Sequence, residues 1–341
     1  MGKKTLLARI LFGTGLISVI LWINKYLCRR LVILAYHRVL DLHGLSDDEY
    51  ASDVELVSAS CADFEWQVKF LSRHFPVTTF GDYANKARSG DIRGNLAIIT
   101  FDDGFKDNYA NAFPILKKHN TPAVFFVSVD YLDTGKRFWF EFLVSVIKQL
   151  PEVHFGKIVR LLSVSAEGQD RMAYAEKVLD YMKHVSNDTR LEMIEAVYRY
   201  CEENNITVVD PESRAMSWED VREMSANGME IGSHTLSHPI LSRLSNDEIW
   251  SEVDESRKVI EARTGEECNS LAYPNGGAED MNEAVYEAVG RSGYQYACSY
   301  IPGINIHGKL SVYSLKRLHV ERYTGKAEFA AMLALPGLFG G

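Results

Sequence analysis

The chain has few cysteines and no excess of positive charge. Its 341 residues include five cysteines, an odd number without a Cys-x-x-Cys pair, which argues against a disulfide framework and indicates mostly buried thiols. The net charge of −9 argues against a nucleic-acid partner, because such partners usually require a basic surface. A hydrophobic content of 46% is ordinary for a globular protein. Cysteine usage does not identify the compartment; the cysteines are Cys28, Cys61, Cys201, Cys268 and Cys298.

The chain also lacks a hydrophobic run of the ~20 residues that a membrane span needs. The longest candidate, Ile10–Ile23, is interrupted by glycine, threonine and serine, has basic residues on both sides, and is not followed by a small-residue cleavage site. Three interpretations remain open: a short membrane anchor, an uncleaved or atypical signal segment, and a helix packed on the domain. We expect residues 1–30 to form an anchor segment. The two basic flanks leave the side of the membrane undecided.

Short apolar runs alternate with helical patterns from residue 31 onward. Apolar residues at helical spacing predict helices, for example one capped by Asp63 and another from Asn246 to Gly265. This alternation predicts an α/β fold, and seven or eight units favour a distorted (β/α) barrel over an open doubly wound sheet. The predicted strands are Leu31–Ala35, Val77–Phe80, Leu96–Phe101, Ala123–Val127, Met229–Gly232, Ser270–Tyr273, Tyr294–Ser299 and Leu315–Val320.

A mostly helical and charged stretch, from about residue 132 to 214, breaks this alternation. We interpret it as an insertion after a barrel strand, within one domain that spans residues 31–341. Its simplest role is a helical cap on the barrel. Alternatively, Trp139 in the segment Phe138–Glu141 forms a wall of a sugar-binding site.

Two polar motifs directly follow predicted strands: Thr-Phe-Asp-Asp-Gly at 100–104 and Ser-His-Thr-Leu-Ser-His-Pro at 233–239. Because the ends of parallel strands meet at one edge, we expect the motifs to lie together. Adjacent side chains point to opposite sides, so one aspartate can bind a metal while the other faces substrate or water. If a helical turn follows the strand, His234 and His238 share one face and can bind the same ion. One carboxylate and two imidazoles suit zinc, nickel, cobalt or iron.

Three other strand ends carry candidate residues. A fixed turn at 273–277 (Tyr-Pro-Asn-Gly-Gly) can direct the Tyr273 backbone N–H into the cavity as an oxyanion donor, although an ordinary turn has the same composition. His37 closes the first strand and is either a substrate contact or a structural histidine. Near the last strand, His319 or Arg317 could act as the general acid or beside it.

These three motifs, in this order, resemble the polysaccharide deacetylase family, also called the NodB-homology domain or carbohydrate esterase family four. The resemblance covers about residues 32–322 without the insertion. It implies a distorted (β/α) barrel that removes acetyl groups from N-acetylated sugars with a divalent metal. By motif, Asp102 resembles the general base and Tyr273 the residue whose backbone holds the oxyanion. The metal ligands by the same comparison are Asp103, His234 and His238.

The chain departs from the family pattern in two places. The arginine often found before the Tyr-Pro-x-Gly turn is missing, and residues 268–270 (Cys-Asn-Ser) stand there. The family's Asp-Trp pair is also missing, so the partner that would orient the base is not identified. The final leucine–histidine motif is echoed by Leu318-His319. The opening Tyr36-His37-Arg38-Val39 resembles a subgroup linked to bacterial exopolysaccharide production.

The sequence therefore predicts a metal-dependent hydrolase that removes N-acetyl groups from a sugar polymer in exopolysaccharide or cell-envelope metabolism. Zinc is the expected metal, with cobalt or nickel as alternatives, and the N-terminal segment is expected to associate with a membrane of the bacterial cell envelope. Rival interpretations are a deacetylase or deformylase of a lipid-linked sugar, a non-catalytic glycan-binding component of an exopolysaccharide machine, and a metalloenzyme outside carbohydrate chemistry. The expected site consists of Asp102, Tyr273 and His319 (catalytic), His37, Trp139 and Arg317 (substrate), and Asp103, His234 and His238 (metal).

Overall fold

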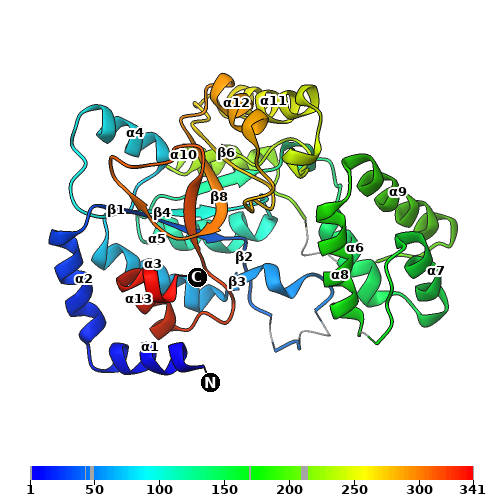
Figure 1. Ribbon diagram of the computed structural model, residues 1–341, viewed down its shortest axis with the longest axis horizontal. Coiled ribbons are helices and arrows are strands. Elements are labelled where there is room, and N and C mark those ends of the chain that lie inside the picture. The colour runs from blue at the N-terminus through cyan, green and yellow to red at the C-terminus, as the bar shows by residue number, and fades with distance from the viewer. Residues whose placement is uncertain (1, 43, 47–49, 169, 209–213, 341) are drawn as a thin grey trace.

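Seven parallel strands close into a barrel in the computed structural model, which describes residues 2–42, 44–46, 50–168, 170–208 and 214–340 (Figure 1). The barrel closes where the last strand, β10, pairs with β1 through Leu34 and Leu318 and through Ala35 and His319. This pairing excludes the open doubly wound sheet and confirms the predicted barrel. In barrel order the strands are β1 (Arg30–Tyr36), β4 (Leu96–Phe101), β5 (Val124–Val127), β6 (Glu230–Ser233), β7 (Ser270–Ala272), β8 (Tyr296–Pro302) and β10 (Leu315–His319).

Three short strands lie outside this ring. β9 (Asn305–Ile306) runs antiparallel to the start of β1, and β2 (Arg38–Val39) pairs with β3 (Val57–Ala59). The helices are α1 (Lys3–Gly13), α2 (Leu16–Leu27), α3 (Cys61–His74), α4 (Phe80–Arg88), α5 (Phe113–Lys118), α6 (Trp139–Gln149), α7 (Glu152–Leu162), α8 (Arg171–His184), α9 (Asn187–Glu203), α10 (Trp218–Ala226), α11 (Asn246–Thr264), α12 (Glu283–Arg291), α13 (Lys326–Ala334) and α14 (Pro336–Phe339).

Both faces of β1, β4 and β5 are buried, which explains their nearly continuous apolar sequences. In β1, Leu31 and Ile33 belong to the cluster inside the barrel, whereas Val32 and Leu34 pack in the layer shared with the surrounding helices. Because side chains alternate along a strand, one apolar run fills two separate cores. The C-terminal ends of the strands are left to carry the polar side chains.

Local capping signals were predicted with mixed success. Gly265 ends α11 in a left-handed conformation, as the predicted helix from Asn246 to Gly265 requires, and a capping box of Ser217 and Asp220 starts α10. The prediction of Asp63 as an N-cap is wrong, because Ser60 caps α3 by accepting the Asp63 backbone N–H at 3.1 Å. The predicted strand at Val77–Phe80 is also wrong. Its first residue forms an isolated bridge to β4, and its last residue begins α4.

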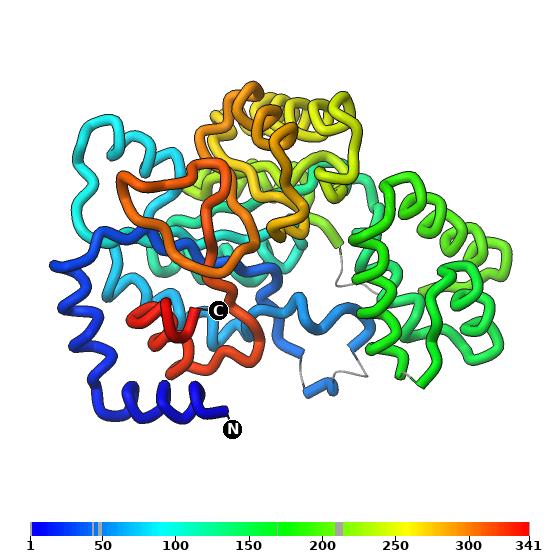
Figure 2. The backbone as a smooth tube through the Cα atoms, in the orientation of Figure 1, coloured from blue at the N-terminus to red at the C-terminus, as the bar shows by residue number. Residues whose placement is uncertain are grey.

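The predicted insertion forms four helices, α6 to α9, between β5 and β6 (Figure 2). These helices share a hydrophobic cluster of their own, with Leu143, Tyr174, Val178 and Val197 among its fully buried members. They form a lobe beside the barrel, and α6 borders the polar end of the strands. The insertion therefore has its own core and also reaches the candidate site.

The N-terminal segment forms α1 and α2, which both contact α13 on the side of the barrel. Among the described residues, no single helix has the length and apolar character to cross a membrane by itself, whereas the bent pair of α1 and α2 meets this test together.

Candidate active site

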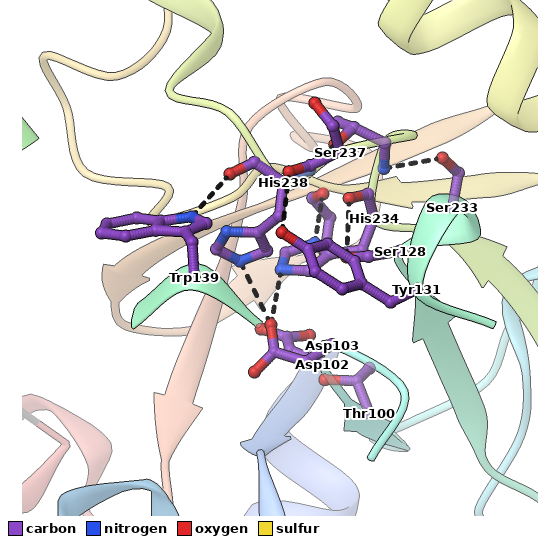
Figure 3. Close-up of polar contacts among 12 residues, drawn as sticks. Thr100, Asp102, Asp103, Ser128, Tyr131, Trp139, Ser233, His234, Ser237 and His238 are labelled. Atoms are coloured by element: carbon purple, nitrogen blue, oxygen red, sulfur yellow. Dashed lines mark hydrogen bonds and ion pairs between the residues drawn. The ribbon is translucent and has the colours of Figure 1, made fainter. Parts of the chain in front are cut away.

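Asp103, His234 and His238 converge at the C-terminal end of the barrel strands (Figure 3). The Nε2 atoms of the two histidines lie 3.3 and 3.2 Å from the same oxygen, Oδ1 of Asp103. All three side chains are buried, and their ligand atoms lie within 4.8 Å of one another. The structure thus brings together the three residues that the sequence predicted as metal ligands.

Left-handed backbone conformations aim these side chains at one point. Asp103, Thr235 and His238 have φ angles of 71°, 68° and 58°. A loop follows β6 in place of the expected helical turn, so that part of the prediction is wrong. The carboxylate of Glu252 on α11 accepts the N–H groups of the two residues between Thr235 and His238, at 2.8 and 3.0 Å. These contacts offset a backbone cost of about 1 kcal/mol for each left-handed residue.

The donor atoms of this cluster fit a transition-metal ion. Nδ1 of His234 donates to the Ala272 carbonyl at 2.7 Å, so Nε2 keeps its lone pair and turns it toward Asp103. In His238, Nδ1 is buried and has no hydrogen-bond partner among the described residues. The separations near 3.3 Å match ligands that share one ion at ~2.0–2.2 Å each. Two imidazoles and one carboxylate also leave a coordination position for substrate or water.

Asp102 points to a different partner, the guanidinium of Arg317. Nη1 and Nη2 donate to Oδ1 and Oδ2, each at 2.7 Å, and Nη1 and Nε also donate to Thr100 and to the Ser299 carbonyl. Burial alone would raise the pKa of Asp102, but the charge of Arg317, with a smaller contribution from His234, holds this pKa below its usual value. Asp102 is therefore ionised at neutral pH with both oxygens fixed.

The assignment of Arg317 as a substrate-binding residue is wrong. Its side chain has no exposed surface and does not border the cavity described below. It is instead the orienting partner of Asp102 that the sequence left unidentified. The two residues are 215 positions apart, and β10 and β4 lie on either side of β1, so barrel closure brings them together.

A cavity of about 300 Å³ opens beside these groups, at the lower end of the range for small-molecule sites. Of the nine residues predicted for the site, seven border it, and the two that do not are Arg317 and His319. The side of the cavity away from the strand ends is formed by loops before β3 and by α6 and α8. The polar and aromatic lining residues include His37, Asp53, Glu55, Trp139, Lys183, Tyr273, Asn275, Tyr300 and Glu321.

His37, predicted as a substrate contact, and His319, predicted as the general acid, occupy different positions. His37 borders the cavity, and its ring meets the edge of Tyr300 at 5.5 Å between centroids. His319 stacks on Tyr300 at 3.6 Å, and its Nε2 atom is buried without a partner among the described residues. Burial, together with the charge of Arg317, lowers the pKa of His319 to about 4. His319 does not border the cavity, and its lowered pKa favours the neutral form, so this position does not favour the predicted role of general acid.

The assignment of the Tyr273 backbone N–H as an oxyanion donor also fails. This N–H donates to the Cys298 carbonyl at 3.1 Å, and the phenol donates to the Tyr313 carbonyl. Two residues later, Asn275 borders the cavity with φ 60°, and its N–H has no acceptor among the described residues. Because Pro274 has no N–H, Asn275 carries the first available amide of the turn, a signal that was present in the sequence.

Residues 89–156 and 171–297, together more than half of the chain, match the family profile of the polysaccharide deacetylases. The chain belongs to the polysaccharide deacetylase family. This assignment agrees with the resemblance of the three motifs, and it fixes the chemistry class of the site as hydrolysis of N-acetyl groups on polysaccharides.

Individual relatives are distant. YxkH of Bacillus subtilis (strain 168) is 21% identical over 314 residues, which are 92% of this chain and 79% of YxkH. Poly-beta-1,6-N-acetyl-D-glucosamine N-deacetylase of Staphylococcus aureus (strain MSSA476) is 32% identical over 108 residues, which are 30% of this chain and 37% of that protein.

Two solved structures share the fold. Streptococcus pyogenes deacetylase PplD, in complex with acetate, aligns with a TM-score of 0.60 and 16% identity over 90% of this chain and 99% of that one. IcaB from Ammonifex degensii aligns with a TM-score of 0.55 and 19% identity over 90% of this chain and 96% of that one.

In this deacetylase the insertion supports the His238 loop directly. The Trp139 indole N–H donates to the His238 carbonyl at 3.3 Å (Figure 3). Nη1 of Arg190 donates to the same oxygen at 3.3 Å. The Arg190 guanidinium also lies 5.0 Å from the centre of the Trp139 ring. Trp139 borders the cavity with 7% of its surface exposed. It therefore holds a candidate metal ligand, a role that the sequence did not indicate.

A Trp139→Phe variant is expected to bind metal about tenfold more weakly, because groups behind metal ligands typically contribute 10–100-fold to affinity. Competition with a chromophoric chelator measures this change. Trp218→Phe is the matched control, because Trp218 is also buried, with Arg263 5.6 Å from its ring, but it does not border the cavity. Equal metal affinities of the two variants would contradict the proposed support of His238.

Proposed function

We propose that this protein is a metal-dependent N-deacetylase of an N-acetylglucosamine polymer. The observation that carries the proposal is the pairing of two separately held aspartates at one cavity. Asp103 faces two imidazoles, whereas Asp102, the next residue, is fixed by Arg317. Hydrolysis of an amide needs an electrophilic centre and a base side by side, and adjacent residues with different partners provide them.

Asp103, His234 and His238 would hold the ion, which is zinc by our assignment, with cobalt or nickel as alternatives. When bound, a divalent ion polarises the acetamide carbonyl and makes water more acidic. The ion pair with Arg317 favours the ionised form of Asp102, so its carboxylate can accept a proton from the attacking water. The N–H of Asn275 is the available donor for negative charge that develops on the carbonyl oxygen.

We assign the proton donor for the leaving amine to His37 in place of His319. His37 borders the same cavity as Asp102 and Asp103. Its backbone is fixed by the hydroxyl of Ser58, which accepts its N–H at 2.9 Å. An imidazole at the border of the cavity can pass a proton to the leaving amine.

His37→Gln is expected to lower kcat by roughly a hundredfold or more, the usual contribution of a general acid, whereas His319→Gln should lower it less than about tenfold. Initial rates of acetate release on one substrate compare the two variants. His319 is the matched control, because its ring also contacts Tyr300 but does not border the cavity. A larger loss of kcat in His319→Gln than in His37→Gln would contradict this assignment and indicate that His319 is the general acid.

The lining favours a neutral glycan. Asp53, Glu55 and Glu321 border the cavity, so an anionic sugar would meet like charges there. A neutral N-acetylated sugar avoids this repulsion. The staphylococcal relative named for poly-beta-1,6-N-acetyl-D-glucosamine supports this substrate class.

The test is acetate release from N-acetylglucosamine oligomers by the full chain loaded with zinc, cobalt or nickel. We expect acetate and free amines in equal amounts, and no release after chelation of the metal. Turnover confined to a lipid-linked N-acetyl or N-formyl sugar would replace the proposed substrate. Glycan binding without acetate or formate release, in metal-loaded protein, would contradict the enzymatic proposal and favour a binding role.

A further inference from the structure

The two N-terminal helices form a bent arm on the surface of the barrel domain. α1 and α2 meet at an angle of 84°, with Gly15 at φ 75° between them. The longer helix has 12 residues, or ~18 Å at 1.5 Å per residue, which falls short of a ~30 Å hydrocarbon layer. Neither helix can therefore span a bilayer while it keeps this conformation.

The inner face of the arm belongs to the folded domain. Ala8, Ile17 and Leu21 are buried in the main hydrophobic core, and both helices contact α13. Asn24 donates to the Ala334 carbonyl at 2.8 Å, which ties the end of α2 to α13. Straightening the pair into one membrane-crossing helix would break these contacts. A partner would therefore bind the two helices in their bent arrangement.

The outer face of the arm is apolar and uncovered. Of the eighteen exposed large apolar side chains in the described part of the chain, ten lie on these two helices. Trp22, Tyr26 and Leu27 have 62%, 68% and 78% of their surface exposed, and the two aromatic rings pack edge to face at 5.4 Å. An apolar area of this kind usually marks a site of contact with a partner. One of the ten, Phe12, packs its ring against Trp66 of α3, with the centroids 6.2 Å apart. We call the area formed by the other nine the outer face; its members are Leu6, Leu7, Ile10, Leu16, Val19, Trp22, Ile23, Tyr26 and Leu27.

The charged residues of the N-terminal segment itself all have one sign. Residues 1–30 contain six Lys and Arg and no Asp or Glu, although the whole chain has a net charge of −9. These basic residues are at both ends of the arm, three before or within α1 and three at the end of α2 or just after it. Exposed tryptophan, tyrosine and leucine beside Lys and Arg form the composition that suits the boundary between lipid headgroups and acyl chains.

We propose that α1 and α2 lie in the plane of an anionic phospholipid membrane, with the outer face buried at the headgroup boundary. The apolar side chains supply binding energy through burial, and the basic residues are attracted to the negative lipid surface. A second protein with an apolar groove would bury the same side chains, but it would not need positive charge at both ends of the arm. The charge pattern therefore selects the lipid surface.

Flotation of the full chain with vesicles tests the proposal. We expect binding to vesicles of equal parts phosphatidylcholine and phosphatidylglycerol, weaker binding to phosphatidylcholine alone, and release by salt. The double variant Trp22→Ser with Leu27→Ser should lower partitioning by about tenfold or more. The matched control is Val153→Ser with Leu191→Ser, because these side chains are 82% and 51% exposed on the insertion. Equal vesicle binding by the two double variants, or no binding by the unaltered chain, would overturn the proposal.

Two further readouts separate the alternatives. The Trp22 contribution to the fluorescence is the part that disappears in Trp22→Phe. Lipids brominated near the headgroup should quench this contribution more strongly than lipids brominated at the end of the acyl chain. The opposite order would indicate a span and overturn the in-plane arrangement. The oligomeric state in solution gives the second readout. If neither protein binds vesicles, and the unaltered chain is a dimer whereas the Trp22→Ser, Leu27→Ser variant is a monomer, the outer face joins two copies of the chain and the proposal is wrong.

Discussion

Replacing Asp102 by asparagine is expected to lower kcat by roughly 10³-fold while metal content stays the same. Asparagine keeps the size of the side chain and one acceptor for Arg317, but it cannot take a proton from water, and general bases typically contribute 10²–10⁴-fold. The change also leaves the buried charge of Arg317 without a counter-charge, at a cost of about 3 kcal/mol in the free energy of unfolding. Both quantities need to be measured, because a misfolded variant would also be inactive.

Asp107→Asn is the matched control for this variant. Asp107 forms an equally buried pair with Arg38, with Nε and Oδ2 2.9 Å apart, but it does not border the cavity. We expect a smaller loss in the free energy of unfolding, because Arg38 keeps the buried carboxylate of Glu141 at 3.5 Å as a counter-charge, and a far smaller loss of kcat per folded molecule. If the two variants lose the same fraction of kcat, Asp102 contributes only stability and the assignment of the base is wrong.

Replacing His234 by alanine is expected to abolish stoichiometric metal binding and to lower kcat by about a thousandfold. A bound divalent ion supplies several kcal/mol of stabilisation to the developing charge, and each 1.36 kcal/mol corresponds to a factor of ten in rate. Elemental analysis of the purified protein measures the metal, and acetate release measures kcat. Adding zinc, cobalt or nickel to the unaltered protein after chelation should restore activity, but it should not restore the variant.

His307→Ala controls for the loss of a buried histidine. His307 is buried, with Nδ1 2.9 Å from the Tyr83 hydroxyl, and it follows β9 at the opposite end of the barrel from the metal cluster. We expect its metal content to equal that of the unaltered chain. Full activity of His234→Ala after all bound metal has been removed would show that this enzyme does not use the Asp103, His234 and His238 cluster.

The barrel and the metal cluster were accessible to sequence reasoning because their signals are local. β4 runs over Leu96–Phe101, as predicted, because a continuous apolar run buried on both faces looks the same in sequence and in structure. Asp103 and His234 lie within two residues of the end of a strand, and His238 lies four residues after His234. The rule that parallel strands end at one edge was enough to bring them together.

The residues that support these groups were not accessible in this way. Arg317 looks like any charged residue near a strand end, and its role depends on where β10 closes the barrel. Glu252 and Arg190 act through backbone atoms of the loop after β6, and backbone contacts leave little trace in a side-chain pattern. Asn275 differs, because the missing N–H of Pro274 marked it. The prediction instead chose Tyr273, the first residue of the turn, and the family resemblance pointed to the same residue.

The contact between Arg317 and Asp102 spans 215 positions and joins the last strand of the barrel to its second. Contacts this remote along the polypeptide form slowly, because a long loop must close first. A partly folded molecule would thus already contain most of its helices, while the Asp102 carboxylate would still lack its contact with Arg317. During refolding, recovery of catalytic activity should lag behind recovery of the helical circular-dichroism signal. The length of the lag would measure how long β10 takes to close the barrel.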